Sequence, residues 1–306
     1  MKTNSYKECP VGDAAFCDAD HFQAGRQLLQ RPLLPLVRLV HLLFLTGPFT
    51  TLGELLSQLT EPLETAGINY DHPADLLAPH LTALRPLEAL KDPASEAKKI
   101  TILDQHDHPL PAMEALAMQV NQAVLEQELE AINSLLCGPC RCSLCCTGPT
   151  EEMRQLFFEI PLQPEEANLM ALPQIDTPAS QARDSATEPP FELHGRPFYQ
   201  QPPAVYHWRA GWSMILPHGS SCPQLDDRGG CRIYPARPKV CRRPQIFAYI
   251  LECDEEAQSS QDPPVYRARH KLLAVWDCPY VQVLQDEIAA FAQLSGLEPI
   301  FRTNKN

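Results

Sequence analysis

The sequence predicts a mainly α protein: a helical N-terminal domain, residues 1–136, followed by a small irregular α+β domain rich in cysteine, residues 137–306. Three observations support this fold class. A length of 306 residues suits two domains. Between Phe22 and Leu136, apolar residues recur at steps of three and four, as on the buried face of a helix. Ten of the twelve cysteines follow Leu136, among short alternating segments separated by polar stretches.

The N-terminal domain is expected to contain four or five helices. One begins after Thr50 or Thr51, because Glu54 lies three positions beyond Thr51, as in a capping box. Another opens near Pro73, a residue that suits the first turn of a helix. The longest covers roughly residues 111–136 and leads directly into the cysteines. Nothing in this half indicates a role.

The cysteine-rich half is expected to mix short strands with helices. A strand begins at Phe157, and the chain then turns at Pro164 into a helix with an acidic first turn. Residues 204–216 alternate as a strand or hairpin, with Gly211 near the turn. An amphipathic helix covers residues 278–296. Two polar stretches are predicted to be loop insertions: residues 173–190 and 254–264.

The net charge, the N-terminal residues and one apolar run indicate where the protein is located and which partners are excluded. The formal charge is -13 and the pI is near 5.2, which argues against nucleic acid and anionic membranes as partners. The first twenty residues lack the apolar stretch of a secretory signal, so a cytoplasmic protein is expected. The apolar run from Pro32 to Phe49 is interrupted by Arg38 and His41, which predicts a core helix and no membrane span.

The clustered cysteines are the main chemical signal. In a reducing compartment, clustered thiols are more often metal ligands than disulfides. The segment CGPCRCSLCC contains two C-x-x-C pairs, a spacing that lets the backbone wrap around a metal. A later segment, CPQLDDRGGCRIYPARPKVC, has too little apolar content to pack alone, so we expect the two groups to interleave around metal. The candidate metal ligands are Cys137, Cys140, Cys142, Cys145, Cys146, Cys222, Cys231, Cys241 and Cys278. Cys9, Cys17 and Cys253 are expected to be ordinary free thiols.

The number of thiols and the local charge favour an iron–sulfur cluster over zinc, with [4Fe–4S] as the expected type. Nine candidates exceed the four ligands of one structural zinc site and suit two centres. The stretch from Arg228 to Arg243 carries six basic residues, and positive charge stabilises an anionic cluster. Arg237 and Arg242, next to prolines, are the candidate cofactor-binding residues. The alternative is that these arginines are solvated or pair with nearby aspartates.

The segments CRCSLCC, EIPLQPEEA and GCRIYPARPKVCRRP resemble those of the YkgJ-type cysteine-cluster family of zinc- or iron-chelating domains. The family pattern is C-x-x-C-x-x-C-C followed by C-x-I-Y-x-x-R-P-x-x-C-R, and the second part matches here from Cys231 to Arg242. Pro139 stands where the family has its first cysteine, with thiols available nearby at Cys137 and Cys140. The resemblance implies a metal or cluster site. A similar cysteine set in flagellin lysine N-methylases adds methyl transfer as an alternative.

Together these observations predict a metal-binding protein that holds an iron–sulfur cluster or zinc. The expected use is electron transfer or cluster-dependent redox chemistry, with an unknown redox or protein partner. Two alternatives remain: an interaction module in which zinc only supports the fold, and an enzyme resembling protein lysine methyltransferases. No catalytic residue is identified, because the sequence has no nucleophile or acid–base pair at a recognisable spacing. The sequence leaves open whether the protein is an enzyme.

Overall fold

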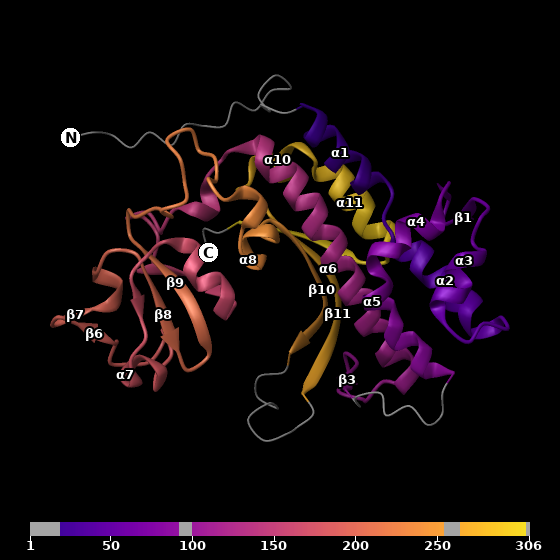
Figure 1. Cartoon of the computed structure of the whole chain (residues 1–306), viewed down its shortest axis with the longest axis horizontal. Coiled ribbons are helices and arrows are strands. Elements are labelled where there is room, and N and C mark those ends of the chain that lie inside the picture. The colour runs from indigo at the N-terminus through magenta and orange to yellow at the C-terminus, as the bar shows by residue number, and fades with distance from the viewer. Residues whose placement is uncertain (1–18, 92–99, 254–263, 304–306) are drawn as a thin grey trace.

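The computed structural model describes residues 19–91, 100–253 and 264–303 of the chain. These residues form an α+β protein with two four-stranded sheets and two small hairpins. The prediction of a mainly α protein is therefore wrong. Figure 1 shows a long helix, α6 (Ala112–Cys140), crossing the middle of the molecule, with one sheet alongside it and the other sheet beyond its C-terminal end.

The N-terminal part is helical, as expected, but also contains three short strands. Its elements are α1 (Ala19–Gln30), α2 (Leu34–Thr46), α3 (Leu52–Gln58), α4 (Pro73–Leu77), α5 (Leu81–Leu84), the 3-10 turns η1 (Ala78–His80) and η2 (Arg85–Leu90), and strands β1 (Leu63–Thr65), β2 (Ile68–Tyr70) and β3 (Thr101–Leu103). The predicted N-cap of α3 is confirmed, since the Thr51 side chain accepts a hydrogen bond from the Glu54 amide at 3.2 Å. The Glu54 carboxylate in turn accepts the Thr50 amide at 2.9 Å.

Helix α6 connects two hydrophobic cores. Val120 and Val124 pack with α2 to α5, whereas Leu129 and Ile132 pack with α1 and the sheet of β10 and β11. Burial on both sides explains why α6 continues four residues past its predicted end at Leu136. Most of the stability of such a helix comes from packing and not from intrinsic propensity.

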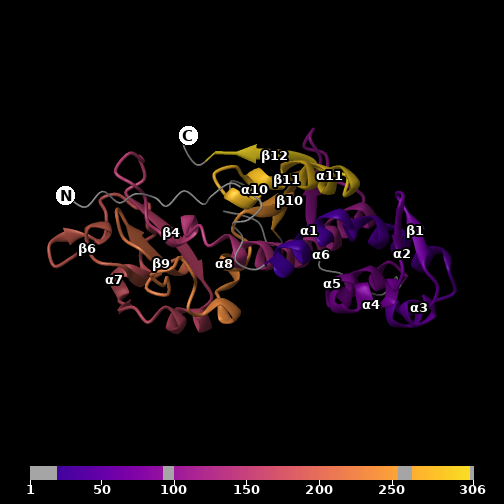
Figure 2. The same ribbon diagram turned by 90° about the horizontal axis from the view of Figure 1, so that it is seen from above.

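The sheet beside α6 contains most of the strands that the sequence did not predict. Strands β10 (Ile246–Cys253) and β11 (Val265–Val275) are antiparallel, and β12 (Glu298–Arg302) and β3 pair in parallel with opposite ends of β11. Helices α10 (Pro279–Val283) and α11 (Gln285–Leu294) replace the single helix expected over residues 278–296. Figure 2 shows α11 and α1 lying near this sheet and α6.

The second sheet has the order β4-β9-β8-β5 and lies beyond the C-terminal end of α6. The strand expected at Phe157 and the hairpin expected over residues 204–216 are both confirmed. This region consists of β4 (Phe157–Leu162), η4 (Pro164–Met170), β5 (Gln174–Ile175), α7 (Pro178–Gln181), β6 (Glu192–Leu193), β7 (Arg196–Pro197), η5 (Phe198–Gln200), β8 (Ala204–Trp208) and β9 (Gly211–Pro217). A cluster of aromatic rings, including the stacked pair Tyr206 and Trp208, fills the core on one face of the sheet.

The predicted loop insertions and domain division have different outcomes. The stretch 173–190 contains the short elements β5 and α7. Residues 254–263 of the second insertion lie outside the described residues. The division of the chain at residue 136 stays a prediction, although one core joins Leu136 to Ile246 and Phe291 across that point.

The apolar N-terminal helices were compared with the length and composition that a membrane-spanning helix needs. No single helix in the described part of the chain is long and apolar enough to cross a membrane. Helices α1 and α2, which are bent by 47° at the break between them, are together long and apolar enough to do so, judged by length and composition alone. Six residues of α2 are buried inside the protein: Leu34, Pro35, Leu36, Val37, Val40 and Phe44.

Candidate metal centre

The C-terminal end of α6 and the turn after it orient the first group of thiols. The helix ends at Cys140, and Arg141 takes the left-handed conformation (φ 48°), with its amide bonded to the Cys137 carbonyl at 3.3 Å. Ser143 is also left-handed (φ 56°). Residues other than glycine adopt this conformation at a cost of order 1 kcal/mol and often do so at functional sites. The two turns direct the chain back on itself.

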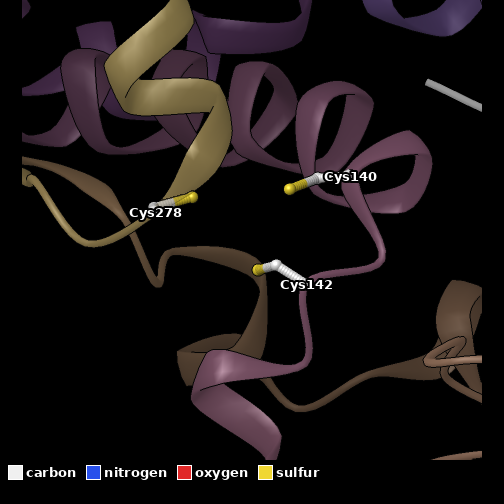
Figure 3. Close-up of side chains that lie close together, drawn as sticks. All are labelled: Cys140, Cys142 and Cys278. Carbon is white, nitrogen blue, oxygen red and sulfur yellow. The ribbon is translucent and has the colours of Figure 1, made fainter. Parts of the chain in front are cut away.

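Three thiols form what we term the closed thiol group: Cys140, Cys142 and Cys278. Their Sγ atoms all lie within 4.8 Å of one another. They come from the end of α6, the turn after it and the residue before α10, and Figure 3 shows all three sulfurs pointing toward a common centre. Cys140 is 3% exposed and Cys278 is fully buried. The structure thus joins residues that are far apart in the sequence.

Five thiols form a second set, which we term the cavity thiol group: Cys145, Cys146, Cys222, Cys231 and Cys241. All five line one cavity of about 790 Å³. Backbone pairing brings the early and late cysteine segments together, because the Cys222 amide donates to the Cys146 carbonyl at 2.7 Å. The late thiols therefore interleave with the early ones, as expected from the sequence.

Two carboxylates position the late segments of the cavity thiol group. Asp226 accepts hydrogen bonds from the amides of Arg228 and Gly230, both at 2.8 Å, and so fixes the loop that leads to Cys231. Glu166, at the start of η4, accepts the Gln163 amide and the Lys239 amide, also at 2.8 Å each. Lys239 is the first residue of α8 (Lys239–Arg242), which carries Cys241.

Cys137 lies between the two thiol groups. It is one helical turn before Cys140 on α6 and lines the cavity together with Cys142. The Arg237 guanidinium donates to the Cys137 Sγ at 3.7 Å. Burial raises the pKa of the Cys137 thiol to about 12. A nearby cation compensates part of the cost of a thiolate at this buried position.

Hydrogen bonds between thiols shift their pKa values in opposite directions. The pKa of Cys142 is lowered to about 3, first because the Cys140 thiol donates to its sulfur and then because the Cys278 thiol does so. The pKa of Cys145 is lowered because the Cys146 thiol donates to it, and that of Cys146 is raised by the same bond. Each thiol group thus contains one cysteine with a lowered pKa, Cys142 in the closed group and Cys145 in the cavity group. A lower pKa favours the thiolate, the form in which cysteine binds metal.

The two predicted cofactor-binding arginines lie in different places. Arg237 is 7% exposed, lines the cavity and stacks on the Tyr234 ring, with its Cζ atom 3.7 Å from the ring centre. It also donates to the Tyr234 carbonyl at 3.1 Å and the Ser134 hydroxyl at 3.2 Å. The Nε atom of Arg242 lies 3.2 Å from a carboxylate oxygen of Glu130 on α6. Arg242 is not among the residues that line the cavity.

Several residues that build the site carried no recognisable sequence signal. Ser134 accepts hydrogen bonds from Arg237 and, through its carbonyl, from the Tyr234 hydroxyl. Gly138 allows this approach, because a Cβ there would lie 3.0 Å from the Tyr234 hydroxyl oxygen. Gly138 and Tyr234 are far apart in the sequence, so their contact can be recognised only from the fold.

Replacing Gly148 by alanine should strongly disturb the cavity thiol group. Gly148 lies two residues after Cys146, and an added Cβ would sit 2.0 Å from the Pro217 carbonyl oxygen at the end of β9. Because that contact is with backbone, the cysteine segment has to shift, at a cost of about 1–3 kcal/mol. We expect a lower thermal unfolding midpoint and less bound metal. The matched control is Gly53→Ala, where the nearest atom is 4.0 Å from the added Cβ and no loss is expected; equal effects of both changes would contradict this account.

The donor atoms fit metal and not another class of ligand. Eight thiols gather in two groups within the described residues, a ninth lies between them, and all are free of disulfides. Thiolates are soft ligands that select zinc and iron–sulfur clusters. Cysteines from distant segments of the chain, gathered in two groups, are typical of a cysteine-cluster metal-chelating domain.

Residues 136–264 match the family model named CxxCxxCC and described as a "Putative zinc- or iron-chelating domain". Residues 136–264 are thus similar to this cysteine-cluster family, which confirms the resemblance seen in their motifs. The match does not cover residues 1–135 and ends before Cys278. Searches of curated proteins and of solved structures returned no significant match.

Proposed function

We propose that the cavity thiol group holds an iron–sulfur cluster of the [4Fe–4S] type, and that the protein uses it for electron transfer or cluster-dependent redox chemistry. The observation that carries this proposal is that the five thiols of this group, together with Cys137 and Cys142, line one cavity of about 790 Å³. A structural zinc ion takes four ligands in a closed tetrahedron and leaves no such space. A cubane cluster is larger, and each of its four irons takes one thiolate.

The residues around the cavity suit an anionic redox group. Arg237 holds a buried positive charge beside the thiols, and its guanidinium is kept in place by Tyr234 and Ser134. Apolar side chains, including Ile160, Met170 and Phe247, form part of the cavity wall. An iron–sulfur cluster exchanges electrons at a potential set by nearby charge, hydrogen bonds and solvent exposure. Arg237 and these apolar walls are the means by which this chain would set that potential.

The test is metal and acid-labile sulfide analysis, with a visible spectrum, on the full chain purified without oxygen. Iron and sulfide in equal amounts, with a broad visible absorption that bleaches on addition of dithionite, would support the proposal. Zinc without sulfide in the cavity thiol group would contradict it and would favour the alternative of an interaction module that metal only stabilises. Cytoplasmic location and a redox or protein partner remain part of the proposal.

Replacing Cys241 by serine should remove the cluster. Cys241 lies on α8 and lines the cavity with the other four thiols, so the variant should lose most of its iron and sulfide. The matched control is Cys253→Ser: Cys253 ends β10, where its sulfur lies 3.9 Å from the Val265 carbonyl oxygen, and it does not line the cavity. Full iron content in Cys241→Ser would exclude Cys241 as a ligand.

A further inference from the structure

We propose that the closed thiol group is a separate structural metal site, which binds a single zinc ion and fastens α10 to the end of α6. The site lies partly outside the matched family domain, because Cys278 follows the last matched residue, 264. The inference goes beyond the proposed redox function, since it assigns a second centre with a different metal and a different role.

Distances between the sulfurs favour a single ion over a cluster at this site. With zinc–sulfur bonds of about 2.3 Å, the sulfurs of a tetrahedral site lie about 3.8 Å apart. The three Sγ atoms of Cys140, Cys142 and Cys278 already lie within 4.8 Å of one another without metal. In a cubane cluster each thiolate binds a different iron atom, so the sulfurs are held farther apart.

Burial distinguishes this site from the cavity. Neither Cys140 nor Cys278 is among the residues that line the cavity, and only Cys142 reaches it from the closed thiol group. Structural zinc sites are closed, with protein ligands at every position, whereas reactive metal sites keep one position open. Cys137, one helical turn before Cys140 and close enough to Cys142 for that thiol to affect its pKa, is the thiol that would supply the fourth ligand.

The ligand type favours zinc over a single iron ion. Sites of nitrogen, oxygen or sulfur donors generally bind Zn²⁺ more tightly than Fe²⁺. The strained turn through Arg141 and Ser143 supports a site at this position, because it returns the chain so that Cys142 faces Cys140.

The expected structural role follows from the elements that the ligands join. Cys278 immediately precedes α10, whose Tyr280 and Val281 are fully buried in the same core as the C-terminal half of α6. A zinc ion bound to Cys140 and Cys278 would cross-link these two segments in the folded state only, so its binding free energy would add to stability.

The test compares zinc content in the full-length wild-type protein and Cys278→Ser, with Cys253→Ser as the control. We expect Cys278→Ser to hold one zinc fewer per chain, to keep the metal of the cavity thiol group, and to lose amide-exchange protection in α10 and α11. X-ray absorption at the zinc edge of the wild type should show sulfur neighbours at about 2.3 Å. If the proposed iron–sulfur cluster is wrong and both sites take zinc, the wild type holds two zinc ions and Cys278→Ser one, and the closed site still stands.

Two results would overturn the closed site. One is zinc content in Cys278→Ser equal to that of the wild type. The other is joint loss of all metal in a folded Cys278→Ser protein, which would show one shared centre. Because Cys278 is fully buried, Cys142→Ser serves as a second variant at a half-buried position, with folding checked by circular dichroism. It should lose the same single zinc, and unchanged zinc content there would also overturn the site.

Discussion

Replacing Asn133 by alanine should lower the thermal unfolding midpoint by about 5 °C or more, the effect of losing about 3 kcal/mol in a chain of this size. Asn133 is fully buried on α6. Its amide donates to the Ile246 carbonyl at 2.7 Å, and its carbonyl oxygen accepts the Ile246 amide at 3.2 Å and the Tyr280 hydroxyl at 2.6 Å. Alanine would leave three buried polar groups without partners.

The same side chain joins the three elements that position the thiols. Asn133 bonds β10 and α10 to α6, so its loss should also reduce zinc in the closed thiol group. The graded control is Tyr280→Phe, which removes one of the three hydrogen bonds and should cost about 1 kcal/mol. An Asn133→Ala protein as stable as Tyr280→Phe would show that Asn133 does not connect these elements.

Replacing Glu128 by glutamine should change how stability depends on pH. Glu128 is 5% exposed on α6, and burial raises the pKa of its carboxyl from the usual 4.5 to about 8. One carboxyl oxygen accepts the Leu33 amide at 2.9 Å at the start of α2. The other has no partner among the described residues. The pKa of Tyr70 is raised first by burial and then by the nearby Glu128 carboxyl.

The direction of this pH dependence follows from the protons that Glu128 binds in the folded and unfolded states. Between pH 4.5 and about 8 the folded protein keeps a proton on Glu128 that the unfolded chain releases, so this contribution to stability is complete at low pH and is lost as pH rises. The loss is of order 1.4 kcal/mol per pH unit, a few kcal/mol in total. Glutamine keeps the bond to Leu33 and does not ionise, so the variant should be the more stable protein at pH 8.5.

The measurement is the thermal midpoint of wild type and Glu128→Gln from pH 5 to pH 8.5. Burial lowers the pKa values of His41 and His80, which therefore also contribute to the pH dependence of stability. Both proteins contain these histidines, so the difference between the two thermal midpoints reports on Glu128 alone. The matched control is Glu114→Gln, at an exposed position in the first turn of α6, which should leave the pH dependence unchanged. Parallel curves for wild type and Glu128→Gln would refute the assignment.

The sequence predicted those parts of the fold whose local signals agree with their surroundings. The cap at Thr51, the strand at Phe157 and the hairpin around Gly211 rely on nearby residues alone. Strands β10 and β11 were not predicted, because β10 is a short apolar run that also suits a helix, and β11 carries charged residues over its first half. Their strand structure depends on α6, which covers them.

The sequence predicted that the early and late cysteines lie together, but not how they are grouped. C-x-x-C spacing pairs Cys137 with Cys140 and Cys142 with Cys145, whereas the structure places Cys142 with Cys140 and Cys145 with Cys146. The cause is the left-handed turn at Arg141. Because an arginine rarely adopts this conformation, the sequence gives no reason to predict it. Which thiols of each group bind metal, and whether Arg237 acts on a cofactor, stay predictions.

The parallel pairing of β11 with both β3 and β12 has a consequence for how the protein is made. Strand β3 is synthesised long before β11, and Cys278 and β12 come after it, so this sheet and the closed thiol group assemble only when the last part of the described chain has left the ribosome. Closing such long loops is slow compared with forming local hairpins. Cys140 and Cys142 are therefore synthesised well before Cys278, the third member of the closed thiol group.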